Sequence, residues 1–280
     1  MLDVEGAVTR SGSAWVALPG ADWHYDGERY AAVTALRRTE QAAMAQFGAD
    51  GRCLMRALQE ELDDPEPSDC GRCAVCTAPR FDGPLDPDLV RQAALHLRSR
   101  PLVLEVKKMA PGPEGGMKKL PDDVRAEEGR ALARLGDGGW DPLVQEGRRA
   151  GRVDDELVAA AAEAIRRWGP AIDWVAAVPS LRSGPLVPDF AERLAGALGL
   201  PFAAAVERVT DGPPQREMAN SVQQVANVRG AFAVSGDLPP GACLLVDDVR
   251  FSGWTLAMLA GQLRKRGATA VFPFALTTAF

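Results

Sequence analysis

The sequence predicts a multidomain α/β protein, and three observations support this fold class. The chain has 280 residues, which is enough for two or three cores. Strand-like apolar runs after residue 171 alternate with helical patterns, as in a parallel sheet covered on both faces. Four of the five cysteines fall between residues 53 and 76, well before this region. The apolar runs cover residues 172–178, 202–206, 242–249 and 270–276.

Composition narrows the class of protein further. Hydrophobic residues make up 46% and charged residues 25% of the chain, which excludes a disordered or fibrous protein. No apolar run approaches the ~18–20 residues that span a bilayer, and residues 1–5 lack the start of a secretion signal. We therefore expect a cytoplasmic protein without a membrane partner. The net charge of −6 argues against indiscriminate coating of nucleic acid but permits a local basic face.

The first part of the chain predicts few regular elements. Residues 2–18 are typical of a small β-hairpin with a turn at 11–13, and helical spacing covers 27–48 and 52–62. The Asp-Asp-Pro-Glu-Pro stretch at 63–67 ends the second helix.

The middle of the chain predicts a winged-helix-like domain. A helix at 88–98 precedes a strand at 101–106, and helical patterns follow at 122–135, 142–150 and 154–168, the last capped by Asp154 or Asp155. The predicted domains are a hairpin and linker at 1–26, a helical cysteine module at 27–84, the winged-helix-like domain at 85–170 and the parallel sheet with helices at 187–198 and 254–266 in 171–280.

The clustered cysteines predict a structural zinc site. Cys53-x16-Cys70-x2-Cys73-x2-Cys76 supplies four thiolates, enough to close a tetrahedral shell and leave no open position for catalysis. Four unrelated buried cysteines are the alternative. Cys243 lies in an apolar run and is expected to be a core residue.

The residues around these cysteines resemble a known module. Asp50-Gly51-Arg52-Cys53-Leu54-Met55-Arg56, Leu62-Asp63-Asp64-Pro65 and Cys70-Gly71-Arg72-Cys73-Ala74-Val75-Cys76 are similar to the zinc-binding module of RecQ-family DNA helicases. The resemblance covers roughly residues 27–80. It implies a module that supports folding and contributes to DNA binding.

The helicase motor has no counterpart in the sequence. No G-x-x-x-x-G-K-[ST] loop occurs, so we expect no ATP hydrolysis by this chain alone. The expectation is that the chain is the C-terminal region of a longer helicase. ATP would then belong to motor lobes elsewhere in the same parent chain.

A second motif lies at the end of the predicted strand 242–249. Two acids, Asp247 and Asp248, end the strand, and a short loop with Ser252 and Gly253 then opens a helix that includes Thr255. Such a loop places backbone N–H groups and a helix N-terminus around a phosphate. The acids are placed to hold ribose hydroxyls or a magnesium ion, or they are ordinary surface residues.

This second motif resembles the phosphoribosyl-diphosphate loop of type I phosphoribosyltransferases, with the competence-protein (ComF-type) branch nearest. Val178-Pro179-Ser180-Leu181-Arg182 is similar to the family's pyrophosphate loop, and residues 213–216 and 227–232 are similar to its mobile segment. The resemblance covers about 171–280. It implies that Ser252, Gly253 and Thr255 grip a 5′-phosphate and that Arg182 meets a pyrophosphate.

Two residues depart from that family's pattern. Phe251 stands where purine-salvage members carry the acid that acts on the base, which puts that chemistry in doubt. Trp254 replaces a small residue, and its ring would crowd the phosphate unless it turned away. The alternatives are therefore transferase turnover, binding of a phosphoribosyl ligand or nucleotide, and a purely structural domain.

The two resemblances together are similar to the RecQ-like (RqlH-type) helicases, which unwind DNA with ATP in the 3′-to-5′ direction. The expected partner is then DNA, single-stranded or forked, bound without sequence preference. A run of basic residues in the middle of the chain predicts where DNA would bind, although an ordinary solvated hairpin is an equal alternative. The predicted DNA-binding residues are Arg98, Arg100, Lys107, Lys108, Lys118 and Lys119.

Overall fold

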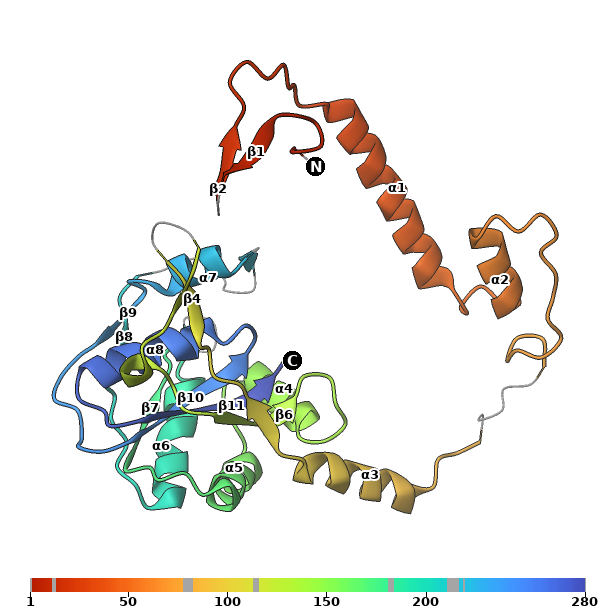
Figure 1. The fold of residues 1–280 in the computed structure, drawn as a ribbon. Coiled ribbons are helices and arrows are strands. Elements are labelled where there is room, and N and C mark those ends of the chain that lie inside the picture. Colours follow the sequence, from red (N-terminus) through yellow and green to blue (C-terminus); the bar gives the residue numbers. More distant parts are fainter. Residues whose placement is uncertain are drawn as a thin grey trace. The chain divides into compact units, whose positions relative to one another are not determined.

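The computed structural model describes most of the chain in two compact units (Figure 1). The N-terminal unit comprises residues Met1–Asp86 and the C-terminal unit Pro87–Phe280. The described residues are 2–11, 14–77, 83–112, 116–180, 184–210, 217–218 and 220–279.

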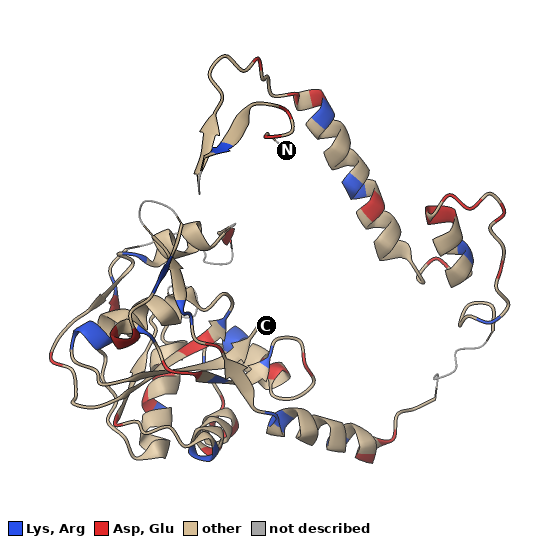
Figure 2. Ribbon diagram, viewed as in Figure 1, with Lys and Arg blue, Asp and Glu red and all other residues tan. Residues whose placement is uncertain are grey.

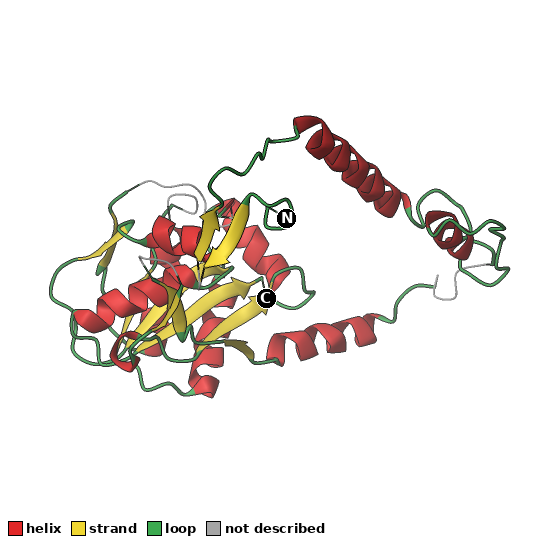
Figure 3. Cartoon of the chain, turned by 45° about the horizontal axis from the view of Figure 1, so that its top comes forward, coloured by secondary structure: helices red, strands yellow, loops and turns green. Residues whose placement is uncertain are grey.

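A five-stranded sheet is the centre of the C-terminal unit (Figure 3). Its order is β3-β6-β11-β10-β7, with β3 antiparallel to β6 and every other neighbour parallel. The sheet is therefore mostly parallel, as the alternation of apolar runs and helices predicts. The strands are β3 (Leu102–Leu104), β6 (Gly129–Arg134), β7 (Trp174–Ala177), β10 (Cys243–Arg250) and β11 (Val271–Thr278).

Helices cover both faces of this sheet. Leu244 and Val246 of β10 pack with α4 (Asp141–Ala150), α5 (Asp155–Trp168) and α6 (Leu186–Leu198). Cys243 and Leu245 point to the other face, against α8 (Trp254–Lys265). Because side chains alternate along a strand, β10 is buried on both sides and contains almost no polar residue before its end.

Residues 122–135 differ from the predicted helix. They form the short 3-10 turn η1 (Asp122–Val124) and then strand β6, which lies between β3 and β11. The alanines and leucine of β6 favour a helix locally, but sheet pairing overrides that preference. Gly129 permits the close approach, since a Cβ there would lie 2.5 Å from the carbonyl oxygen of Pro273 on β11.

The predicted winged-helix-like domain at 85–170 is not a separate domain. β3 and β6 come from this segment, yet β6 pairs with β11 from the end of the chain. The boundary predicted at residue 170 therefore lies inside one compact unit. Apolar residues of α5 share a core cluster with β10, so the middle segment completes the sheet instead of forming its own core.

Smaller elements lie on the α8 side of the sheet. The strand predicted over 202–206 is displaced, because only Phe202 bridges to Val175 and the regular strand is β8. Ala110 of β4, Val225 of α7 and Trp254 of α8 form a small core cluster there. These elements are β4 (Met109–Pro111), β5 (Met117–Lys119), β8 (Val206–Arg208), α7 (Ser221–Val228) and β9 (Phe232–Val234), and α3 (Pro87–Ser99) begins the unit.

The N-terminal unit has the predicted hairpin and helices but little core. Its elements are β1 (Val8–Ser11), β2 (Ala14–Ala17), α1 (Gly27–Gln46) and α2 (Leu54–Glu61). Among its described residues only Cys53 and Ala57 are buried hydrophobics. In the described part of the chain, no helix is both long and apolar enough to cross a membrane.

Candidate functional site

The four clustered cysteines meet at one point in the N-terminal unit. Their sulfur atoms all lie within 4.8 Å of one another. The sulfurs of Cys53 and Cys73 are 3.8 Å apart, which is about the edge of a tetrahedron of thiolates ~2.3 Å from a zinc ion. The donor set and its spacing therefore fit a metal ion of the zinc type, as predicted.

Local backbone geometry directs N–H groups at these sulfurs. The N–H of Cys70 donates to the sulfur of Cys53 over 3.2 Å and lowers the pKa of that thiol. The N–H groups of Cys76 and Leu54 lower the pKa of the Cys73 thiol to about 6. Contact with the Cys53 sulfur raises the pKa of Cys76 to about 12. Two of the four sulfurs are thus favoured as thiolates, the form that binds metal.

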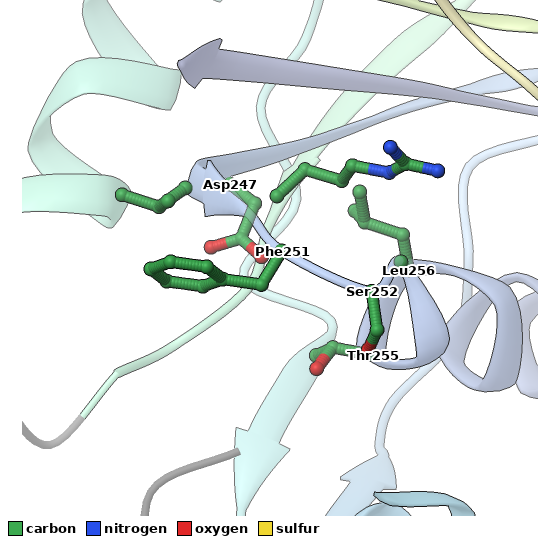
Figure 4. A pocket seen from close by; sticks show the side chains of 8 residues that line it. Asp247, Phe251, Ser252, Thr255 and Leu256 are labelled. Carbon is green, nitrogen blue, oxygen red and sulfur yellow. The ribbon is translucent and has the colours of Figure 1, made fainter. Parts of the chain in front are cut away.

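The second candidate site lies where β10 ends and α8 begins. A pocket there is lined by the end of the strand, the loop and the first turn of the helix, including Asp247, Phe251, Ser252, Gly253 and Thr255. Figure 4 shows the Asp247 carboxylate at the strand end and the Ser252 and Thr255 side chains at the start of α8. The structure thus brings together all the predicted ribose and phosphate residues of this loop except Asp248.

Asp248 faces the opposite side of the sheet from Asp247. Its carboxylate accepts a hydrogen bond from Arg148 of α4 over 3.1 Å. Arg148 also donates to Gln145, whose amide donates to Asp141, and Thr277 of β11 donates to the same Asp141. This network fixes the end of β10, and Arg148 supplies Asp248 with a positive partner.

Among the described residues, no cation forms an ion pair with Asp247. It is 8% exposed and accepts the N–H of Asp248 over 2.9 Å. Burial, together with the neighbouring Asp248 charge, raises the pKa of Asp247 well above its usual value. A magnesium ion or ribose hydroxyls at this carboxylate would relieve that penalty, so the chemistry of the donor set fits the predicted ligands.

The loop before α8 is built for close approach of a ligand. Gly253 has a φ of 80°, and a Cβ there would lie 3.1 Å from the Nε of Arg250. No side chain caps the N-terminus of α8. The Ser252 hydroxyl is buried and has no hydrogen-bond partner among the described residues. An unpartnered buried hydroxyl beside uncapped N–H groups is an arrangement that an anion completes.

Of the two residues that depart from the family pattern, Phe251 lines the pocket and Trp254 does not. Trp254 is buried against Ala110 and Val225, so its ring turns away from the pocket and does not crowd it. Phe251 lines the pocket with no acid in its place. Arg182 of the predicted pyrophosphate loop, like residues 213–216, lies outside the described residues.

The six predicted DNA-binding residues are in different surroundings, and Figure 2 shows acidic residues interspersed among the basic ones of this unit. The guanidinium of Arg98 lies 4.1 Å from the Trp140 ring centroid and within 3.7 Å of Glu156, where it joins α3 to the sheet unit. Lys107 is half-buried, with its Nζ 5.1 Å from the Trp254 ring centroid. The other four are exposed: Arg100, Lys108, Lys118 and Lys119.

The sequence analysis missed two basic residues at this end of the sheet. Arg250 lines the pocket itself. Arg148 donates to Asp248, which lies 100 positions later in the sequence. No local pattern at residues 141–150 predicts that contact. A sequence signal at Arg250 was available, since this arginine lies two residues after Asp248, between the acidic pair and the loop with Ser252 and Gly253.

Comparisons with known proteins give a limited result. No family model matches this chain, and no curated protein matches it. One solved structure that is similar is described as a crystal structure of adenine phosphoribosyltransferase. The likeness has a TM-score of 0.33 and 15% sequence identity, and it covers 66% of this chain and 89% of that one. A likeness at this level does not establish a family.

Proposed function

We propose that the C-terminal unit binds a phosphorylated ribose, either phosphoribosyl diphosphate or a nucleotide, in the pocket at the start of α8. The observation that carries the proposal is the buried Ser252 hydroxyl at the N-terminus of α8, where the described residues supply neither a partner for the hydroxyl nor a side-chain cap for the helix. The same pocket contains the Asp247 carboxylate, which can accept hydrogen bonds from ribose hydroxyls. Phosphate and ribose contacts are thus available within one pocket.

Each residue has a specific role in this proposal. Ser252, Thr255 and the backbone at Gly253 donate hydrogen bonds to the 5′-phosphate, helped by the positive end of the α8 dipole. Asp247 binds ribose hydroxyls, and Asp248, held by Arg148, keeps the end of β10 in place. Arg182 meets the diphosphate, as the family resemblance implies. Magnesium, when bound, would neutralise the diphosphate charge at Asp247.

The proposal is for binding and does not extend to transfer onto a purine base. A transferase of that kind needs an acid to exchange a proton with the base. Phe251 stands at the corresponding position and has no ionisable group. Other acceptors would need a different proton-transfer group, and among the described lining residues Asp247 is the only carboxylic acid.

Calorimetry with the full chain tests this function. The wild-type protein should release or absorb heat with phosphoribosyl diphosphate and magnesium, with one site per chain. The double variant Asp247→Asn/Asp248→Asn should lose this signal while keeping its fold by circular dichroism. The matched control is Asp237→Asn, which lies outside the pocket and should bind as the wild type does. A folded wild-type protein that gives no heat at millimolar ligand would contradict the proposal.

We also propose that the four cysteines hold a structural zinc ion. A closed shell of four thiolates leaves no position for a substrate, so the ion would supply folding energy and no chemistry. Elemental analysis should return one zinc per chain.

A second candidate function is that of an accessory, DNA-engaging region of a RecQ-like helicase. The observation that favours it is the gathering of four sulfurs with the spacing of that module. The exposed residues Arg100, Lys108, Lys118 and Lys119 are the candidates for phosphate contacts. Fluorescence anisotropy with forked and single-stranded DNA tests this function. Salt-dependent binding is expected, and its absence at low salt would refute it for this chain.

A further inference from the structure

A second, larger cavity lies beside the ribose-phosphate pocket in the C-terminal unit. This cavity, here called the basic groove, has a volume of about 710 Å³. Its principal lining residues are Lys107, Lys108, Met109, Met117, Arg250 and Trp254. Arg250 lines both cavities, so the groove and the pocket are neighbours. The groove is of the size that small organic ligands occupy and is far too small for a nucleic-acid duplex.

Positive charge in the groove exceeds the negative charge available to balance it. Lys107 and Arg250 are both half-buried, and no carboxylate of the described residues lies within 4.0 Å of either. Glu128 lines the groove but is paired with Arg130 over 2.6 Å. Glu105 attracts both cations without forming an ion pair with either. Three cations thus face one unpaired carboxylate.

The two half-buried cations both have lowered pKa values. Burial lowers the pKa of Lys107, and the neighbouring Arg250 charge lowers it further. Burial also lowers the pKa of Arg250. An anion between these cations would remove the repulsion and replace lost solvation with charge-assisted hydrogen bonds.

Besides its charged residues and Ser221, the groove is lined by apolar side chains. Met109 and Met117 are 41% and 54% exposed, so their thioether side chains are available to a ligand. Trp254 is 3% exposed and forms a fixed part of the wall beneath Lys107. Methionine side chains adapt to flat apolar groups and contact aromatic rings favourably.

We propose that the basic groove binds a second ligand, an organic anion that carries a carboxylate or phosphate on an apolar ring. Its anionic group binds Lys107 and Arg250, and its ring lies against Met109 and Met117. The proposal goes beyond ribose-phosphate binding. It is tested without phosphoribosyl diphosphate, so the two proposals can fail separately.

The test is a calorimetric titration of the full chain with benzoate and phenyl phosphate, and with benzamide as the neutral counterpart of benzoate. Both anions should bind the wild type, and benzamide should bind about tenfold more weakly or not at all. Lys107→Gln should weaken both anions about tenfold, because it removes a charged donor. Lys107→Arg should still bind both anions. This variant keeps the positive charge, so it separates an effect of lost charge from an effect of lost fold.

The matched control is Lys118→Gln, which makes the same charge change on β5 outside the groove lining and should bind both anions as the wild type does. Equal weakening in Lys107→Gln and Lys118→Gln would indicate a diffuse basic surface, of the kind DNA uses, and would overturn the proposal. So would failure of the folded wild type to bind either anion. Competition between benzoate and phosphoribosyl diphosphate would assign Arg250 and Lys107 to the ribose-phosphate pocket and would also overturn it.

Discussion

The two units of this protein are stabilised by different means. In the C-terminal unit, a sheet covered on both faces buries large side chains such as Trp174, Phe190 and Phe274 completely. In the described part of the N-terminal unit, Cys53 and Ala57 are the only buried hydrophobics. Burial supplies most of the free energy of folding in ordinary domains, so the N-terminal unit needs another source. In the account proposed above, a metal ion held by its four cysteines provides that source.

The long helix α1 illustrates the same contrast. It has 20 residues and none of them is buried, and Val33, Leu36 and Met44 are exposed. Polar contacts join its start to the hairpin, since Glu5 accepts hydrogen bonds from Trp23 and from Arg29. Exposed ion pairs of this kind contribute little to stability. They do not replace a core.

The largest expected effect is the loss of the metal. Cys73→Ser, or treatment with a strong chelator, should unfold α2 and the cysteine segment, because thiolate–zinc binding supplies ~10–16 kcal/mol in small zinc domains. The C-terminal unit should keep its structure. Limited proteolysis followed by mass spectrometry checks both parts. Cys243→Ala is the control. Cys243 is buried in β10, so its substitution should leave the zinc content unchanged.

A core substitution in the C-terminal unit should destabilise that unit and leave the cysteine segment of the N-terminal unit intact. Phe190→Ala removes a fully buried ring from α6 and should lower the free energy of unfolding of the C-terminal unit by about 3–5 kcal/mol. Urea denaturation measures this loss, and elemental analysis should still return one zinc per chain. If zinc were lost together with the core, the two units would not be stabilised separately.

The ribose-phosphate pocket predicts a smaller change, in which ligand binding weakens while the stability of the unit is not lowered. Ser252→Ala should weaken phosphoribosyl diphosphate about tenfold, because the phosphate loses one charge-assisted hydrogen bond. It should not lower stability, because the hydroxyl it removes is buried and has no hydrogen-bond partner in the part of the chain that the structure describes. Ser235→Ala is the control: that hydroxyl donates to Glu207 over 2.8 Å and lies outside the pocket, so binding should not change.

The smallest expected effect is a pH dependence at Asp247. Its pKa is raised in the folded state by burial, so the folded protein holds this proton more tightly than the unfolded chain. The carboxyl group therefore costs stability as the pH rises above the unfolded value of 3.8. Asp247→Asn should raise the melting temperature of the C-terminal unit at pH 7 by about 2–4 °C and change it little at pH 3–4. A gain of the same size at both pH values would show that ionisation is not its cause.

The sequence predicted the sheet where a strand carries its own signal. β10 is apolar from Cys243 to Val246 and β11 from Val271 to Leu276, and a glycine lies shortly before each strand, so their positions and the parallel arrangement could be predicted. β6 could not be, because its residues Gly129–Arg134 have the composition of a helix and become a strand only by pairing with β11. Because no local signal announced that pairing, the sequence analysis predicted the middle of the chain as a separate domain.

The candidate sites followed the same rule. The cysteine cluster and the loop from Asp247 to Thr255 are local in sequence, and the structure brings together the four cysteines and, at the loop, Asp247, Ser252, Gly253 and Thr255. The sequence analysis missed two pairings of distant segments. Arg148 donates a hydrogen bond to Asp248, and Lys107 and Arg250 line the same groove. Arg98 was assigned to DNA from its charge alone, but its guanidinium packs on Trp140.

Hydrogen–deuterium exchange along the full chain tests most directly whether a metal holds one unit and burial the other. A chelator should speed exchange across residues 50–77 and leave β7, β10 and β11 protected. Phosphoribosyl diphosphate with magnesium should slow exchange at residues 247–256 and nowhere in the N-terminal unit. Chelation that exposes the strands of the sheet, or a chelator without effect on the cysteine segment, would contradict the account.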